Sequence, residues 1–121
     1  MDTCSMPNPI LVNDDEPAIL KLMARILSKN GHAVDTASNG EEGIKKIEAN
    51  DYSLILTDIK MPGISGHQVF EHLRNKAKKA TPVIGMSGTP WLLDQNNFDA
   101  VLQKPSSLKE MLHLIRQFTE K

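Results

Sequence analysis

The amino-acid sequence predicts an α/β fold, in which a parallel sheet of five strands is covered by helices on both faces. Short apolar runs alternate along the 121 residues with longer segments of helical period, as the elements of such a fold do. The runs are almost continuously apolar, which is typical of strands buried on both faces. A chain of this length fits one domain and buries enough surface to need no disulfide.

The first strand is predicted at residues 9–12, and an acidic segment follows it. The acidic run 14–16 with Pro17 indicates a helix start, because acidic residues there complement the helix dipole and accept hydrogen bonds from free N–H groups. Apolar residues then recur at helical spacing on one face: Ile19, Leu22, Met23, Ile26 and Leu27. Asn30 and Gly31 end this helix.

The remaining elements continue the alternation. A weaker strand at 33–37 leads to a turn at 38–40, and stronger strands are predicted at 54–57, 82–86 and 100–102. Three further helices are predicted from apolar residues at helical spacing. The inward residues are Ile44 and Ile47 in the helix at 41–50; Val69, Phe70 and Leu73 in a helix that Ser65 caps; and Leu108, Met111, Leu112, Ile115 and Phe118 in the last helix.

Composition and charge exclude several classes of function. The 14 basic and 15 acidic side chains give a net charge of −1, so there is no excess of basic residues for direct, sequence-independent binding of nucleic acid. No apolar run approaches the roughly 18–20 residues that span a membrane, and no signal peptide is evident. The single cysteine, Cys4, indicates a reducing compartment. We therefore expect a cytoplasmic domain at 10–121, preceded by a flexible leader at 1–9.

Polar side chains follow four of the predicted strands. Asp14 and Asp15 follow the first strand, Asp58 the third, Ser87 the fourth and Lys104 the fifth. Because the carboxyl ends of parallel strands meet at one edge, where ligands bind in such folds, we expect these groups to converge. Three carboxylates repel one another unless a cation lies between them, and Mg²⁺ suits such oxygen ligands.

Together these groups match the requirements of phosphoryl transfer to Asp58. The carboxylate is the nucleophile, while the metal and the Lys104 ammonium neutralise charge on the phosphoryl oxygens and Ser87 supplies a hydroxyl donor. Each residue alone also fits a helix cap, a turn or a strand exit. Their joint placement at four strand ends favours the functional interpretation. The four histidines lack the spacing of a zinc site.

With these residues identified, the chain resembles the receiver domain of bacterial two-component response regulators over nearly its full length. The matching segments are ILVNDDEP at 10–17, LILTDIKMPGISG at 54–66, PVIGMSG at 82–88 and VLQKP at 101–105. The resemblance implies a flavodoxin-like sheet with the strand order 2-1-3-4-5, which the chemotaxis receiver exemplifies. It also implies a signalling domain that catalyses its own phosphorylation and dephosphorylation and is not otherwise an enzyme.

The resemblance assigns a role to each site residue. Asp58 would accept a phosphoryl group from a sensor histidine kinase or a histidine phosphotransfer protein. Mg²⁺ would be held by Asp15, Asp58 and the backbone carbonyl of Lys60, with Asp14 acting through a bound water. Lys104 would pair with Asp58 and then with the phosphoryl group. Ser87 would turn toward a phosphoryl oxygen and start a conformational switch. The switch could produce a phosphorylation-dependent dimer, and it would act on an output partner that the sequence does not identify.

Two departures from the family pattern keep a second hypothesis open. Val101 stands where receivers usually carry an aromatic residue, and valine has one stiff torsion and no ring to rotate. The stretch from Ser87 to Lys104 is about one helical turn shorter than is common in the family. The helix that receivers carry in this stretch, which is the fourth in the family's order, is therefore expected to be short or irregular. A receiver-like interaction module that signals without phosphate is therefore the alternative. A magnesium-dependent phosphatase with an aspartyl nucleophile ranks last, because its Asp-x-Asp motif and cap are absent.

Overall fold

The computed structural model describes residues 8–58, 63–64, 66–87, 99–103 and 108–119. Five strands form one parallel sheet in the order β2-β1-β3-β4-β5, which confirms the predicted fold and strand order. The strands are β1 (Ile10–Asn13), β2 (Val34–Ala37), β3 (Leu54–Asp58), β4 (Val83–Ser87) and β5 (Ala100–Gln103). The predicted fourth helix, within 89–97, and residues 1–7 of the predicted leader lie outside the described residues.

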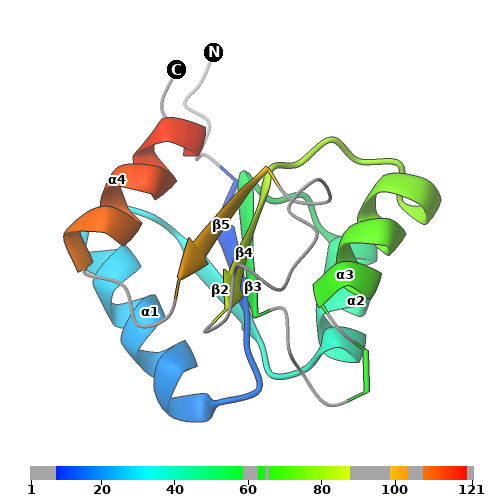
Figure 1. Cartoon of the computed structure of the whole chain (residues 1–121), viewed down its shortest axis with the longest axis horizontal. Helices are drawn as coiled ribbons and strands as arrows, with labels where there is room; N and C mark the ends of the chain where they lie inside the picture. The colour runs from blue at the N-terminus through cyan, green and yellow to red at the C-terminus, as the bar shows by residue number, and fades with distance from the viewer. Residues whose placement is uncertain (1–7, 59–62, 65, 88–98, 104–107, 120–121) are drawn as a thin grey trace.

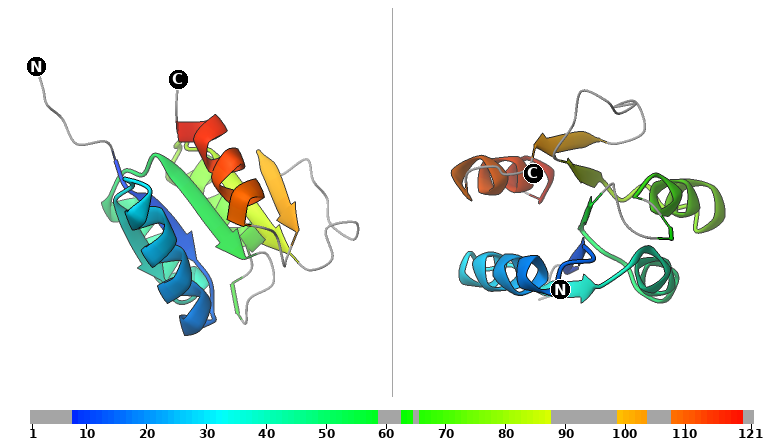
Figure 2. Two further views of the ribbon diagram at one scale, coloured as in Figure 1. Left: turned by 90° about the vertical axis from the view of Figure 1, so that its left-hand side faces the viewer. Right: turned by 60° about the horizontal axis from the view of Figure 1, so that its bottom comes forward.

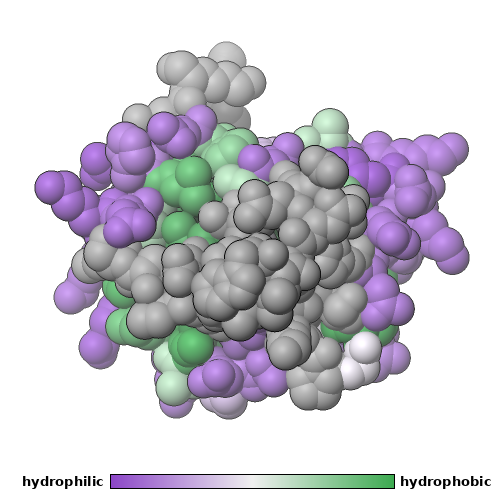
Figure 3. Space-filling model, in the orientation of Figure 1, coloured by the Kyte–Doolittle hydropathy of each residue, from purple (hydrophilic) through white to green (hydrophobic). Residues whose placement is uncertain are grey.

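Helices cover both faces of this sheet (Figure 1, Figure 2). On one face lie α1 (Pro17–Lys29) and α4 (Leu108–Thr119), and on the other α2 (Gly40–Ala49) and α3 (Gly66–Glu71), which a π-helical turn at His72–Lys76 extends. Among the coloured residues in Figure 3, hydrophilic ones predominate, and apolar ones are visible mainly on the side of α1 and α4. No helix among the described residues is long and apolar enough to cross a membrane.

Each face of the sheet has its own hydrophobic core, because successive side chains of a strand point to opposite faces. The core under α1 and α4 is built from Ile10, Val12, Met23, Leu27, Leu54, Leu56, Ile84, Met86, Leu102, Met111 and Ile115. The core under α2 and α3 is built from Leu11, Ala37, Ile47, Tyr52, Ile55, Val69, Leu73 and Val83. Each strand contributes side chains to one or both cores, which explains why the strand sequences are almost continuously apolar.

Helix α1 differs from its prediction in two ways. It begins at Pro17, as predicted, but it has no acidic residue in its first turn and the Glu16 side chain makes no capping hydrogen bond. Asp14 instead accepts a hydrogen bond from the N–H of Glu16, the residue before the helix. Leu22 is 56% exposed, although it was assigned to the inward face. Leu20 packs against the core instead, because that face is centred on Met23 and Leu22 lies about 100° away from it.

The ends of the helices follow local hydrogen-bonding rules. At the start of α2, the side chain of the N-cap residue Asn39 accepts a hydrogen bond from the Glu42 N–H (2.8 Å). The Glu42 carboxylate accepts one from the N–H of Ser38 (2.6 Å), one residue before the position that a capping box uses. Gly31 has a positive φ of 87° just after α1, as the Asn30-Gly31 signal predicted. These caps place α2 directly after β2, with its N-terminus at the carboxyl edge of the sheet.

Candidate functional site

Three carboxylates meet where β1 and β3 end. One oxygen each from Asp14, Asp15 and Asp58 lies within 4.8 Å of the other two. The strands are neighbours in parallel register, with Asn13 opposite Thr57, so the residues that follow these two meet at the same edge. The prediction that the two acidic segments converge is therefore confirmed.

The three acids differ in their exposure to solvent. Asp14 is fully buried, Asp58 is only 8% exposed, and Asp15 is exposed. Burying a carboxylate is costly unless hydrogen bonds or a cation compensate its charge. Among the described residues, the group thus has a buried part at Asp14 and Asp58 and an exposed part at Asp15, where water or a cation can approach.

Backbone hydrogen bonds hold the acidic turn after β1. The Asp14 N–H donates to the Ala37 carbonyl of β2 (3.1 Å), and the Asp14 Oδ1 accepts a hydrogen bond from the Glu16 N–H (3.0 Å). Asp58 is the last residue of the central strand β3 and stands opposite Met86 of β4. The acids are therefore placed by the sheet and a tight turn, which define their separation.

The donor set suits a hard divalent cation. Among the described residues, this is the one group of three or more His, Cys, Asp or Glu side chains close enough to hold a metal ion, and it contains only carboxylates. Mg²⁺ takes one or two carboxylates and keeps several water ligands, which the exposed side at Asp15 allows. Zn²⁺ prefers histidine and cysteine, which are absent from this group.

The remaining predicted site residues are described only in part. Ser87 ends β4 in register with Gln103 of β5, so its backbone lies at the same edge as Asp58, and its side chain is not described. Lys104 and Lys60 lie outside the described residues. Val101 lies in β5 opposite Gly85. The structure thus brings together the three carboxylates and the end of β4.

Asn13, a fully buried polar residue at the end of β1, is a further residue of this site, to which the sequence pattern assigned no role. Its signal was a lone amide that interrupts an apolar run directly before the acidic pair. In the orientation that its neighbours favour, the amide nitrogen donates to the backbone carbonyls of Asn39 (2.9 Å) and Ala37 (3.2 Å). Asn13 therefore contacts the same carbonyl of Ala37 that holds the Asp14 backbone.

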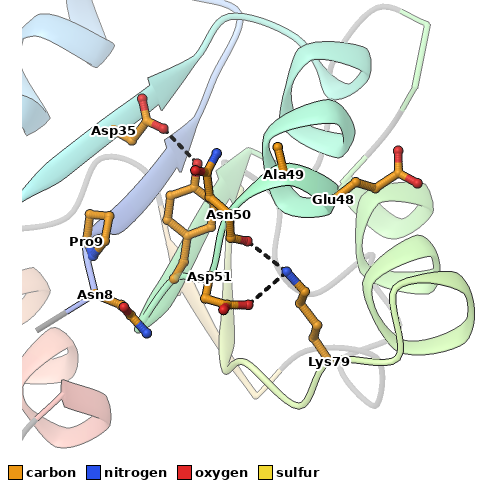
Figure 4. A pocket seen from close by; sticks show the side chains of 9 residues that line it. Asn8, Pro9, Asp35, Glu48, Ala49, Asn50, Asp51 and Lys79 are labelled. Carbon is orange, nitrogen blue, oxygen red and sulfur yellow. Dashed lines mark hydrogen bonds and ion pairs between the residues drawn. The ribbon is translucent and has the colours of Figure 1, made fainter.

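A hollow of about 530 Å³ at the amino-terminal ends of the strands is a structural network (Figure 4). The Tyr52 hydroxyl donates to Asp35 (2.7 Å), and the Lys79 ammonium donates to the carbonyls of Ile47 and Asn50 (2.7 Å each) and pairs with Asp51 (3.0 Å). Because these charged and polar groups bond to one another, they stabilise this end of the sheet.

The same network perturbs two pKa values. Burial alone would raise the pKa of Asp35, but hydrogen bonds from Tyr52 and Lys46, the Lys46 charge and the Thr36 N–H lower it below its usual value. Burial, together with the Asp35 carboxylate, raises the pKa of Tyr52 above its usual range. Asp35 is therefore held as a carboxylate and Tyr52 as a neutral phenol.

Comparison with known proteins agrees with this geometry. The family model described as "Response regulator receiver domain" matches residues 10–116. The transcriptional regulatory protein TcrA of Mycobacterium tuberculosis is 32% identical over 117 residues, which is 93% of this chain and 46% of the relative. ResD of Bacillus subtilis, another transcriptional regulatory protein, is 49% identical over 76 residues, or 62% of this chain and 30% of that protein. The chain spans about half the length of TcrA, or less for ResD.

Solved structures resemble the chain over nearly its full length. The response regulator TrrA of Thermotoga maritima, in complex with Mg(2+)-BeF, has a TM-score of 0.83 and 35% identity, covering 92% of this chain and 98% of that one. The receiver domain of the hybrid histidine kinase CckA has a TM-score of 0.81 and 29% identity, covering 93% and 99%. One of these structures is of a response regulator and the other is of the receiver domain of a kinase.

Proposed function

The chain belongs to the family of response regulator receiver domains, the phosphoacceptor domains of two-component systems, and from this premise we propose that Asp58 accepts the phosphoryl group. One observation carries the assignment: Asp58 ends the central strand and has two further carboxylates within 4.8 Å. Of the three acids it is the one on β3, between the strands that carry Asn13 and Ser87. An acceptor in this position is reached from the carboxyl edge of the sheet.

The proposed reaction is a direct transfer to the carboxylate. A carboxylate oxygen of Asp58 forms a bond to phosphorus while the bond from phosphorus to the donor's histidine nitrogen breaks, and that nitrogen keeps the electron pair. The buried side of the site limits access of water, which favours survival of the acyl phosphate. Later attack by water releases inorganic phosphate and restores the carboxylate, so the domain resets itself.

Magnesium is part of this proposal. Asp15 and Asp58 would bind the ion directly, with the backbone carbonyl of Lys60 as a further ligand and Asp14 acting through a water. When bound, the ion supplies positive charge that neutralises the phosphoryl oxygens. The carboxylate-only donor set supports this choice, and TrrA, which is 35% identical, was solved with Mg(2+)-BeF.

The remaining parts of the proposal concern residues and partners beyond the described site. Lys104 would pair with Asp58 and then with the phosphoryl group, and the Ser87 hydroxyl would move to a phosphoryl oxygen. The phosphodonor would be a histidine kinase or a histidine phosphotransfer protein in the cytoplasm. The phosphorylated domain would form a dimer. TcrA and ResD are transcriptional regulatory proteins, so a transcriptional output is the corresponding proposal for a longer protein.

The acceptor assignment is tested by intact mass spectrometry with acetyl phosphate as donor. The wild type should gain one phosphoryl group in Mg²⁺ and none in EDTA, and Asp58→Asn should gain none. Asp51→Asn, an exposed acid at the opposite end of the sheet, is the matched control and should behave as the wild type. An adduct that persists in Asp58→Asn, or a wild type that gains none, would contradict the proposal.

A receiver-like module that signals without phosphate is the second candidate, because β5 carries Val101 where receivers usually have an aromatic residue. Addition of Mg²⁺ and beryllofluoride, followed by backbone NMR, separates the two. A phosphorylation switch predicts shift changes in β5 and α4, remote from Asp58. Changes confined to residues next to the three carboxylates would favour the module.

A further inference from the structure

The amide of Asn13 ties together three elements beside the acidic site. Asn13 is 0% exposed, and its nitrogen donates to Ala37 at the end of β2 and to Asn39, the N-cap of α2. Both carbonyls have a second partner: the Ala37 oxygen accepts from the Asp14 N–H (3.1 Å) and the Asn39 oxygen from the Gly43 N–H (3.0 Å). One side chain therefore links the turn that carries Asp14 to the first turn of α2.

The space around this amide is filled on its other side by α2. A Cβ added at Gly43 would lie 2.5 Å from a terminal atom of the Asn13 amide, which is closer than real Cβ contacts allow, and 3.1 Å from its Cγ, which is a tight contact. A side chain at position 43 would therefore displace the Asn13 amide or shift α2. The glycine leaves room for the amide on this side, while its nitrogen faces the two carbonyls.

A second close contact joins α2 to the segment after Asp58. A Cβ at Gly40 would lie 2.5 Å from the Ile64 carbonyl oxygen and 2.7 Å from the Ile64 Cβ. The first turn of α2 thus packs through Gly43 against the Asn13 side chain, directly before the acidic pair, and through Gly40 against Ile64. A shift of the Asn13 side chain would be transmitted to the adjacent Asp14 backbone, because packed interiors yield little.

We infer that Asn13, held in place by Gly43, is a positioning residue that sets the separation of Asp14 and Asp15 from Asp58 and thereby the affinity for Mg²⁺. The inference rests on the proposed function. Ligand positions must be kept within about 0.5 Å for a productive site, and loss of the groups that orient metal ligands typically weakens binding about 10- to 100-fold. Asn13 acts through the Ala37 carbonyl and the Asp14 backbone, and it is not itself proposed as a ligand.

The test measures the Kd for Mg²⁺ by calorimetric titration of the metal-free chain, with urea denaturation in parallel. Asn13→Val keeps a buried side chain but removes the donor, and should weaken Mg²⁺ binding by about 10-fold or more. Gly43→Ala should weaken it similarly by displacing the amide. In the Asn13→Ala background, Gly43→Ala should cause no further loss, because the space is vacant. Ile47→Val, a fully buried core change on α2, is the control: it should lower stability and leave the Kd unchanged.

Each outcome decides one point. An unchanged Kd in folded Asn13→Val, additive losses in the double variant, or a wild type that binds no Mg²⁺ would each overturn the inference. If Asn13→Val fails to fold, the comparison of Gly43→Ala with the double variant gives the same decision. The wild type could bind Mg²⁺, and Asn13→Val could lower that affinity, while Asp58 takes up no phosphoryl group. In that case the inference stands and the proposed function fails.

Discussion

Replacing Asp15 with asparagine should change stability in opposite directions with and without magnesium. Asp15 is the exposed member of the three-carboxylate group, and within the described part of the chain no hydrogen bond or ion pair involves its side chain. The substitution keeps the size of the side chain and removes one negative charge. Its effect on the metal-free protein is therefore mainly the relief of repulsion with Asp14 and Asp58.

The size of this relief follows from the separation of the carboxylates. Two unit charges at 4.8 Å repel by ~0.9 kcal/mol at the dielectric constant of water and by ~3.5 kcal/mol at an effective value of 20. Asp15 is exposed, so the lower value applies to each of its two pairs, and salt screens it further. We expect Asp15→Asn to raise the free energy of unfolding of the metal-free chain by about 1 kcal/mol at low ionic strength.

Magnesium should remove this advantage. At a concentration ten times its Kd, the ion stabilises the wild type by ~1.4 kcal/mol, and a variant whose Kd is at least 10-fold weaker gains ~0.4 kcal/mol or less. The difference in unfolding free energy between the two proteins should therefore move by about 1 kcal/mol or more toward the wild type.

Urea denaturation followed by circular dichroism, in EDTA and in MgCl₂ at one ionic strength, measures both effects. Glu71→Gln, an exposed acid on α3, makes the same change in net charge and is the control, with no magnesium-dependent difference expected. A variant less stable than the wild type in EDTA would refute the electrostatic argument. Equal stabilisation of both proteins by Mg²⁺ would refute the assignment of Asp15 as a ligand.

Three further predictions concern the scaffold. Hydrogen bonds and the Lys46 charge hold the pKa of Asp35 below its usual value, so the carboxylate should stabilise the fold fully above about pH 4 and lose this contribution as the pH falls further. The urea midpoint of Asp35→Asn should therefore fall less steeply below about pH 4 than that of the wild type. Arg74 donates to two backbone carbonyls and to Asp99 (3.0 Å), so Arg74→Met should cost ~2 kcal/mol in urea denaturation, with Arg74→Lys recovering only part. Lys78 has a φ of +54°, so Lys78→Gly should raise the unfolding free energy by ~0.5–1 kcal/mol, and a loss would contradict the strain.

Most of the fold was predictable because it depends on local signals. Apolar runs located all five strands to within one or two residues, and the Asn30-Gly31 signal placed the end of α1. The resemblance then supplied the strand order, which alternation alone does not determine. Leu22 was misassigned because a stripe at i, i+3 and i+4 fits more than one centre on a helix, and only packing against the sheet selects Met23 as that centre.

The candidate site likewise has features that local sequence signals predict and features that depend on tertiary packing. The amino-acid sequence alone places Asp14, Asp15 and Asp58 at strand ends, because carboxylates interrupt the apolar runs there, and parallel strands bring such ends to one edge. It did not show that the acidic run forms a turn ahead of α1, nor that Asn13 lies under Gly43. These features depend on contacts between β1, β2 and α2, which are distant in sequence. Only tertiary packing decides them, because a buried amide takes its partners from whichever backbone groups the fold leaves beside it.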